Sequence, residues 1–450
     1  MKLQRREAHA LSQLDAFFVA YQESTGILMQ HGVEVEVKAE LSRERLEQVL
    51  SYLVARWPRL GQTLHRGLTG LQWRGECHLE KMLQVSADRR ELALWRNRPI
   101  DPFCEPPFQL LYLTGTSHNT LAFRSHHAVA DGEAFIVICT EAMRVLALMN
   151  GGGSVPAPQL AAKFKLTKII SAAALLRERK LAGVWRYMRR LAAEAAGGEA
   201  GRSMSLTMRG REPGPVATCE RRLDATAFDC LRERATVARV TPAWLCAASW
   251  VRAIGAWNDA QRTAAAAPPP PAGLVSLEVP VSLRPKSGPE DYVGNFISPL
   301  VLFADPSQPL EKIAYGLRRQ LKTGLREGLH LGMPLFTAPA RYLPWPLFRR
   351  LAVNQAATGF ATSHFTWLEQ KVEPEEFSIL SRGALELLDL HTYTPVCLHM
   401  GAALAVVATA ESAKLVLTYR LTAFSEEDAE TLLELVATQL RSEQRRRAVV

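Results

Sequence analysis

Two adjacent histidines followed by an Asp-Gly pair are the residues of this chain best suited to chemistry. They lie in the segment His126-His127-Ala128-Val129-Ala130-Asp131-Gly132. A neutral imidazole, whose usual pKa is about 6.5, can take a proton from a hydroxyl or an amine as that group attacks a carbonyl carbon. Only one histidine is needed for this step, and neighbouring residues of a strand point to opposite faces. The two histidines therefore cannot share the role equally, and we take His127 as the candidate general base and His126 as its support.

Asp131 and Gly132 also have a structural interpretation. Aspartate is a good N-cap residue, and glycine permits a tight turn just before a helix. A carboxylate four residues after His127 can in addition pair with an arginine from elsewhere in the chain and so hold the loop. We expect Asp131 to position the imidazole without transferring a proton itself.

The pattern around this motif predicts a strand that leads into the histidines and a helix that leaves them. Residues 120–125 form a short apolar run, and residues 133–149 show helical spacing of apolar side chains. The same criteria predict further helices at residues 41–54, 241–257 and 424–441, and further strands at residues 33–37 and 274–283. This mixture predicts an α/β protein, an α+β sandwich in which helices pack on sheets.

Length and composition favour two compact units of ordinary globular type. The chain has 450 residues, of which 48% are hydrophobic and 22% charged. The seven cysteines are scattered, without a pair or a Cys/His cluster at metal-ligand spacing, so we predict reduced thiols and no metal site. Because we find no bilayer-spanning apolar run and no apolar signal core, a cytoplasmic location is the default expectation.

The excess positive charge is concentrated in one segment. The net charge of the chain is +9, and residues 163–190 hold nine lysines and arginines against the single acid Glu178. Apolar residues, Trp185 among them, separate these charges as in an interrupted amphipathic helix. Such a segment either lies on an anionic membrane surface or packs on its own protein as a connector. No nucleic-acid-binding motif accompanies the charge, so we do not expect a nucleic-acid partner.

The basic segment also divides the chain. We expect an N-terminal subdomain in residues 1–155, a basic amphipathic connector in residues 156–215 and a C-terminal subdomain in residues 216–450.

The pattern H-H-x-x-x-D-G resembles the signature of the chloramphenicol acetyltransferase-like superfamily of acyltransferases. That superfamily includes peptide synthetase condensation domains, bacterial wax ester synthases and polyketide-associated acyltransferases of lipid or secondary metabolite biosynthesis. Residues 11–18 and 56–60 resemble early motifs of the wax ester synthase branch, and residues 279–285 and 293–299 resemble the late strand and the Gly-Asn turn of the family. The four matches follow one another in the family's order.

This resemblance implies two chloramphenicol acetyltransferase-like subdomains in a V-shaped pseudo-dimer, with His127 in the middle of a central tunnel. An acyl thioester of coenzyme A or of an acyl carrier protein would be a co-substrate and not a bound cofactor. The acyl group would pass to a hydroxyl, with an amine as the less favoured acceptor. The two fused subdomains would already form the channel, so we expect a monomer.

The resemblance also implies roles for residues of the C-terminal half. Arg284 would pair with Asp131, while Asn295 and Ser298 would belong to a turn that supports the site. The backbone N–H of His127, or the turn of residues 295–298, would supply donors to the oxyanion of the tetrahedral intermediate. Ser363 and His364 would lie near the acceptor channel.

Some positions depart from the wax ester synthase pattern, namely Pro242-Ala243 and Pro106-Pro107-Phe108. These differences weaken the label of lipid synthase, and a freestanding condensation-type protein that works with a separate carrier protein stays open as an alternative. Two alternatives stay open at this point. One is a noncatalytic relative that docks a carrier protein or another partner, and the other is a membrane-surface binding protein that uses residues 163–190.

Overall fold

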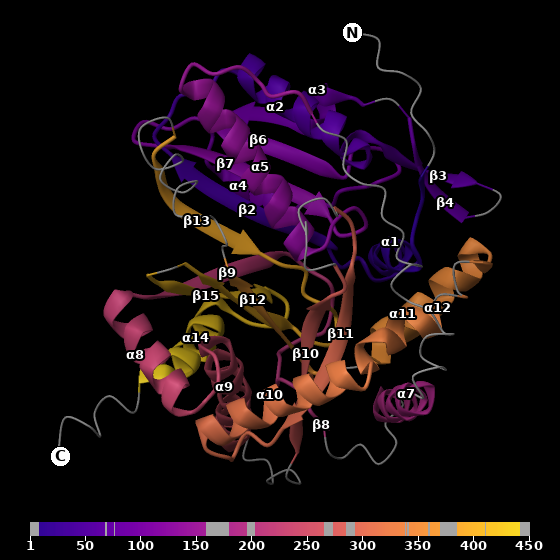
Figure 1. Ribbon diagram of the computed structural model, residues 1–450, viewed down its shortest axis with the longest axis vertical. Coiled ribbons are helices and arrows are strands. Elements are labelled where there is room, and N and C mark those ends of the chain that lie inside the picture. The colour runs from indigo at the N-terminus through magenta and orange to yellow at the C-terminus, as the bar shows by residue number, and fades with distance from the viewer. Residues whose placement is uncertain are drawn as a thin grey trace.

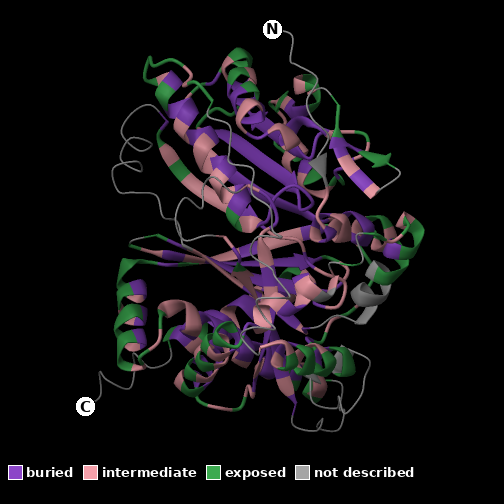
Figure 2. Ribbon diagram, turned by 45° about the vertical axis from the view of Figure 1, so that its right-hand side comes forward, coloured by how far each residue is buried: buried purple, intermediate pink, exposed green. Residues whose placement is uncertain are grey.

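The computed structural model shows a mixed α/β protein with two large sheets, one in each half of the molecule (Figure 1). It describes residues 9–67, 70–75, 77–158, 180–195, 203–264, 273–284, 293–337, 339, 342–358, 361–369, 385–409 and 411–441. Buried strands form the interior of both halves, and the exposed residues lie on helices and loops around them (Figure 2). The expected fold class is confirmed.

The sheet of the N-terminal half has five strands in the order β13-β2-β7-β6-β5. These strands are β13 (Leu387–Tyr393), β2 (Gln30–Val37), β7 (Asn119–His126), β6 (Phe108–Leu113) and β5 (Leu83–Ser86). The helices α2 (Arg43–Arg56) and α5 (Gly132–Asn150) share a hydrophobic core with one face of this sheet. Trp95 of α4 (Arg90–Asn97) packs on the opposite face. A small separate sheet joins β1 (His9–Ala10), β4 (Gly70–Arg74) and β3 (Thr63–Gly67).

The sheet of the C-terminal half has the order β11-β10-β12-β14-β15-β9, and β8 (Ser203–Met204) also pairs with β10. Its strands are β11 (Ile297–Ala304), β10 (Leu274–Ser282), β12 (Ser363–Glu369), β14 (Ala402–Ala408), β15 (Ala413–Arg420) and β9 (Val216–Leu223). One face buries a large core under α8 (Ala225–Val237), α9 (Pro242–Ala264), α10 (Leu310–Arg326) and α14 (Glu426–Arg441). The predicted helices and strands therefore exist, with ends shifted by a few residues.

The other face of the C-terminal sheet is turned toward the N-terminal half. Lys414 of β15 donates to Asp389 of β13 at 2.7 Å, and Glu220 of β9 contacts His391 of β13 at 3.0 Å. Arg96 of α4 reaches Thr218 of β9 at 3.4 Å. Polar contacts thus join the two halves.

Strand β13 belongs to the N-terminal sheet although it comes late in the sequence. It pairs antiparallel with β2, and the Thr392 hydroxyl donates to the Gly32 carbonyl at 3.0 Å. The buried ring of Tyr393 fills the space beside Gly32, where a Cβ atom would overlap it. The boundary between the sheets consequently does not follow the boundary between the first and second halves of the sequence.

The described part of the basic segment is α7 (Leu181–Ala195), whose apolar side packs on the protein. Val184 and Leu191 are buried, and the Tyr187 hydroxyl accepts a hydrogen bond from the backbone N–H of Val301 at 2.9 Å. Trp185 is exposed. Val184 and Leu191 are thus covered by the protein itself, whereas Trp185 is not, and the described helix gives no support to the membrane interpretation.

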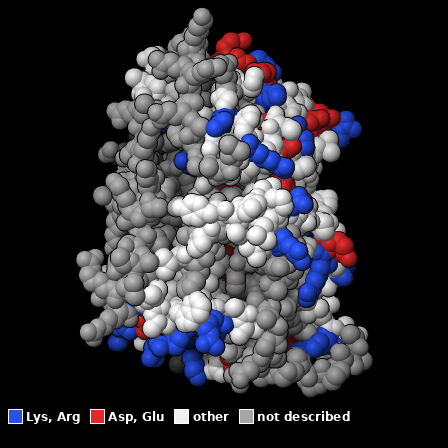
Figure 3. Space-filling view, turned by 90° about the vertical axis from the view of Figure 1, so that its right-hand side faces the viewer, with Lys and Arg blue, Asp and Glu red and all other residues white. Residues whose placement is uncertain are grey.

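Residues 163–179 of that segment lie outside the described residues. On the face of the molecule that carries α7, lysine and arginine side chains form several groups separated by uncharged residues (Figure 3). Within the described ranges, no helix is both long enough and apolar enough to cross a membrane.

Candidate active site

His127 lies in the short connection between β7 and α5. Asp131 is the N-cap of α5, and its Oδ1 atom accepts a hydrogen bond from the backbone N–H of Ala134 at 2.9 Å. Gly132 is the first helical residue, its backbone is not left-handed, and a Cβ atom there would meet no other residue within 4 Å. Neither the backbone conformation nor the space at position 132 therefore requires a glycine.

The carboxylate of Asp131 joins the two halves of the molecule. Arg284 Nη2 donates to Asp131 Oδ1 at 2.8 Å, and the backbone N–H of Phe296 donates to Asp131 Oδ2 at 2.8 Å. The same Arg284 nitrogen donates to the Gly294 carbonyl at 2.8 Å. The side chains of Arg284 and Asp131 are 2% and 0% exposed, so the ion pair is fully buried. It fixes the start of α5 against the turn of residues 294–296.

Asn295 determines which ring nitrogen of His127 carries the proton. Its Nδ2 atom donates to the His127 carbonyl at 2.6 Å and to Asp15 Oδ1 at 2.8 Å, which identifies the amide nitrogen. The remaining atom, Asn295 Oδ1, lies 3.1 Å from His127 Nδ1 and can only accept. His127 Nδ1 therefore carries the hydrogen, and the lone pair of the neutral ring is on Nε2.

Two rings enclose His127. Phe18 of α1 (Gln13–Thr25) stacks on it with ring centroids 3.6 Å apart, and His31 of β2 lies at 4.2 Å in a tilted arrangement. His31 was not among the predicted site residues. In the β2–β7 pair His31 lies opposite Ser125, so extending the predicted strand of residues 33–37 back by two residues would have placed it beside the histidine pair.

Burial keeps the histidines of this site neutral. Desolvation lowers the pKa of His127 to about 4, although the Asp131 charge and the Asn295 hydrogen bond act in the opposite direction. Desolvation also lowers the pKa of His126 to about 3 and holds the pKa of His31 well below its usual value. At neutral pH His127 is consequently a proton acceptor, and 8% of its surface stays exposed.

His126 faces a different space from His127. Its Nδ1 accepts from the backbone N–H of Ala128 at 3.0 Å, so the proton of the neutral ring is on Nε2. That nitrogen is buried and has no hydrogen-bond partner among the described residues. His126 lines a pocket of about 460 Å³ together with Val19, Gln22, Glu23, Arg66, Asp101, Pro102 and Phe103. The side chains of the two adjacent histidines thus lie in different surroundings.

The predicted oxyanion donors are largely occupied. The backbone N–H of His127 donates to the Met29 carbonyl at 2.7 Å, so it is not available to an oxyanion and that expectation is wrong. The N–H of Phe296 is bound to Asp131. The hydroxyl of Ser298 is buried without a hydrogen bond among the described residues. Ser298 lies opposite Val281, whose side chain packs on the C-terminal core, and so faces that core.

Ser363 and His364 are at the start of β12. The Ser363 hydroxyl is buried and donates to the Ser276 carbonyl at 3.2 Å, which ties β12 to β10. His364 Nε2 lies 2.8 Å from the Thr366 hydroxyl, and its Nδ1 lies 3.7 Å from Glu278 Oε1. His364 also contributes to lowering the pKa of His127.

Comparison with known proteins identifies the fold. No protein-family profile and no curated protein sequence matches the chain. The condensation domain of the monacolin K polyketide synthase superposes with a TM-score of 0.65 at 14% identity, covering 97% of both chains. The first condensation domain of the calcium-dependent antibiotic synthetase, in complex with a substrate analogue, gives 0.65 at 15% identity over 97% of this chain and 96% of its own.

Two further solved structures are similar to this chain over almost its whole length. A variant of the starter condensation domain of rhizomide synthetase in complex with C8-CoA has a TM-score of 0.67 at 14% identity, over 96% of this chain and 94% of that one. The X-domain from teicoplanin biosynthesis has a TM-score of 0.59 at 14% identity, over 98% and 96%. The chain therefore has the fold of condensation domains.

Proposed function

We propose that this chain, which has the condensation-domain fold, is an acyltransferase that moves an acyl group from a thioester to an acceptor hydroxyl. An amine is the less favoured acceptor, and His127 is the general base. The observation that carries the proposal is the hydrogen bond from His127 Nδ1 to Asn295, because it leaves the lone pair on Nε2. A neutral imidazole fixed in this tautomer is prepared to accept a proton.

The reaction needs one proton to be moved twice. As the acceptor oxygen forms its bond to the thioester carbonyl carbon, its proton passes to His127 Nε2. When the tetrahedral intermediate collapses, the carbon–sulfur bond breaks and the leaving sulfur takes that proton. The products are an ester and a free thiol, and His127 is neutral again. In this scheme Asp131 and Arg284 hold the loop and do not exchange protons.

The donor is proposed to be an acyl thioester of coenzyme A or of a carrier protein. Support comes from the similar starter condensation domain of rhizomide synthetase, which was solved with C8-CoA. Among the described residues no group of three or more His, Cys, Asp or Glu side chains is arranged to hold a metal ion. The proposed mechanism uses side chains of the protein alone.

The test is release of free thiol from octanoyl-CoA in the presence of a panel of alcohols and amines. We expect His127→Ala to lower turnover by about 100- to 10,000-fold, the usual contribution of a general base. His78→Ala is the matched control, because His78 is exposed and pairs only locally with Glu80 at 3.0 Å. Full turnover by a folded His127→Ala protein would refute the mechanism. No thiol release by the wild-type protein with CoA or carrier thioesters would favour a noncatalytic docking function.

A further inference from the structure

Glu278 occupies an unusual position in the middle of the C-terminal sheet. Its neighbours along β10, Leu277 and Val279, pack on the core under the helices. Because successive residues of a strand point to opposite faces, Glu278 points to the other face. Its register partners are Val301 on β11 and His364 on β12. A carboxylate therefore projects from the face that is turned toward the N-terminal half.

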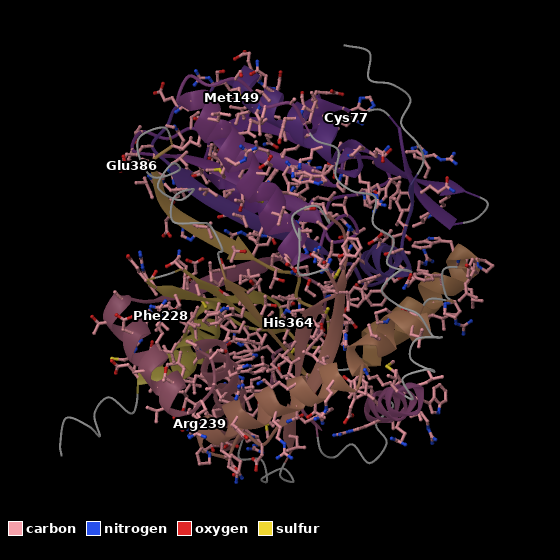
Figure 4. All side chains as sticks on the ribbon, in the orientation of Figure 1. Cys77, Met149, Phe228, Arg239, His364 and Glu386 are labelled. Atoms are coloured by element: carbon pink, nitrogen blue, oxygen red, sulfur yellow. The ribbon has the colours of Figure 1, made fainter. Side chains whose placement is uncertain are left out.

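This carboxylate belongs to the surroundings of His127. Glu278 Oε1 lies 3.7 Å from Nδ1 of His364 on the neighbouring strand, and His127 of the other half is among the groups that lower the pKa of Glu278. His364 lies near the centre of the molecule, where the lower sheet approaches the upper half (Figure 4). Glu278 and His364 therefore project together from the C-terminal sheet toward the half that carries the proposed general base.

The hydrogen-bonding capacity of Glu278 is not used up by the protein. His364 Nδ1 is 3.7 Å from Glu278 Oε1, which exceeds hydrogen-bonding distance. An ionised carboxylate offers about four acceptor positions. Within the described residues no lysine or arginine lies within ion-pair distance of it, and its side chain keeps 28% exposure despite the interior location. Part of the Glu278 side chain is therefore open to a small molecule.

Glu278 is also expected to be charged at neutral pH. Burial raises the pKa of its carboxyl, but the combined effect of His364, His399 and His127 is larger, and the pKa lies below its usual value. A negative charge in an interior of low dielectric attracts a cation strongly.

We propose that Glu278 binds a protonated amino group of the acceptor while the acceptor hydroxyl approaches Nε2 of His127. The preferred acceptor would then be an amino alcohol. That the bound amino alcohol is an acyl acceptor rests on the proposed acyl transfer. The binding of a cationic amine by Glu278 does not depend on that proposal. The ammonium stays protonated on Glu278 and has no lone pair with which to attack. The new bond therefore forms at the hydroxyl oxygen, and the product is an ester with a free amino group.

Equilibrium binding tests the proposal independently of catalysis. The probes are 6-amino-1-hexanol and 1-hexanol, which differ only in the amino group, and their Kd values are measured by calorimetry or ligand-observed NMR. We expect the wild-type protein to bind the amino alcohol about tenfold more tightly, the size of a charge-assisted hydrogen bond, and Glu278→Gln to lose this preference. Equal binding of the two probes by the wild type, or an unchanged preference in Glu278→Gln, would overturn the proposal.

A matched control uses another carboxylate of the same sheet face. Glu220 lies 3.1 Å from Lys414 Nζ and 3.0 Å from His391 Nδ1, so its charge is already compensated. Glu220→Gln should keep the tenfold preference. If Glu220→Gln abolished it as completely as Glu278→Gln, the effect would come from net charge and the assignment to Glu278 would be wrong.

The catalytic measurement separates this proposal from the function on which it draws. With octanoyl-CoA as donor, the ratio of kcat/KM for 6-amino-1-hexanol to that for 1-hexanol should fall about tenfold in Glu278→Gln. Mass spectrometry of the wild-type product should show the ester. An amine preference in binding without any thiol release would refute acyl transfer and keep the amine site. Thiol release with an unchanged ratio would refute the amine site and keep acyl transfer.

Discussion

The imidazole of His127 is fixed from several directions by side chains and backbone of the protein itself. Its backbone N–H is bound to Met29, its Nδ1 atom to Asn295, and its ring is enclosed by Phe18 and His31. In the proposed reaction, an imidazole held in this way would lose little freedom when an acceptor binds, because folding has already oriented it. The hydrogen bond to Asn295 matters most for the proposed reaction, because it leaves the lone pair of the neutral ring on Nε2.

Replacement of Asn295 by alanine tests this orientation. The variant loses the acceptor that holds the proton on Nδ1, so both neutral tautomers become populated. We expect kcat/KM for acyl transfer to fall roughly 10- to 100-fold, which is less than the loss for His127→Ala. Steady-state thiol release measures the effect, and circular dichroism confirms folding. An unchanged kcat/KM in a folded Asn295→Ala protein would show that the tautomer is fixed by another contact.

The pH profile of the same variant gives an independent readout. Transfer requires neutral His127, whose pKa is about 4, so wild-type kcat/KM should be constant near neutral pH and fall as the pH drops through about 4. The Asn295 hydrogen bond raises the pKa of His127, so its removal should move this acidic limb to lower pH. A limb that moved to higher pH would contradict the assignment.

What the sequence could predict at this scale depends on distance along the chain. His127 and Asp131 belong to one short motif, and the positions of both followed from strand and helix rules. His31 and Phe18 reach the ring across a strand pair and from a helix packed in space, and such contacts are set by register and packing. Asn295 was named through family resemblance, while its control of the tautomer required the hydrogen-bond geometry.

At the scale of elements, the buried pair of Asp131 and Arg284 fastens α5 to the end of β10. Asp131 accepts three hydrogen bonds, from Ala134, Arg284 and Phe296, and two of these come from the C-terminal half. A buried charge that loses its partner is costly, because its desolvation is no longer compensated. The loop of His127 is therefore coupled to the stability of the contact between the halves.

We expect Arg284→Ala to lower the free energy of unfolding by about 3 kcal/mol, the usual cost of leaving a buried charge without its partner. Arg221→Ala is the control, since Arg221 pairs with Glu430 and Glu434 on the surface and should cost less than about 1 kcal/mol. Urea denaturation measures both. Equal losses for the two variants would indicate that the Asp131–Arg284 pair contributes no more than a surface pair.

Sequence patterns located the elements better than they located the contacts between them. Residues 133–149 and 274–283 were predicted as a helix and a strand, and α5 and β10 agree with them closely. The sequence patterns did not single out Glu278, because periodicity does not show what a side chain within a predicted strand faces. At Glu278 the neighbours of β10 are β11 and β12, and this order places Glu278 beside His364.

At the scale of the whole molecule, β13 closes the N-terminal sheet with residues from the second half of the chain. Strand β13 packs closely on β2, because the ring of Tyr393 occupies the space beside Gly32. Division of the sequence at the basic segment could not reveal that β13 pairs with β2, since strand pairing between distant segments leaves no local signal. The first and second halves of the sequence are therefore joined by strand pairing as well as by side-chain contacts.

Gly32→Ala should therefore destabilise the protein by about 1 to 3 kcal/mol, as overpacking of a well-filled core does. The double variant Gly32→Ala/Tyr393→Leu tests the cause, because the smaller side chain removes the overlap. It should be less destabilised than the two single variants predict by addition, as measured by urea denaturation. Strict additivity would show that Gly32 and Tyr393 do not compete for the same space.

The late arrival of β13 also sets an order of events during synthesis. Strand β2 is made early, but its outer partner leaves the ribosome only after residues 38–386 have been translated. At ~5–20 residues per second this takes about 20 to 70 s. Throughout that interval one edge of β2 is unpaired, and an unpaired edge is a template for wrong association. The nascent chain therefore has a defined period in which protection of β2 by a chaperone would favour the yield of folded protein.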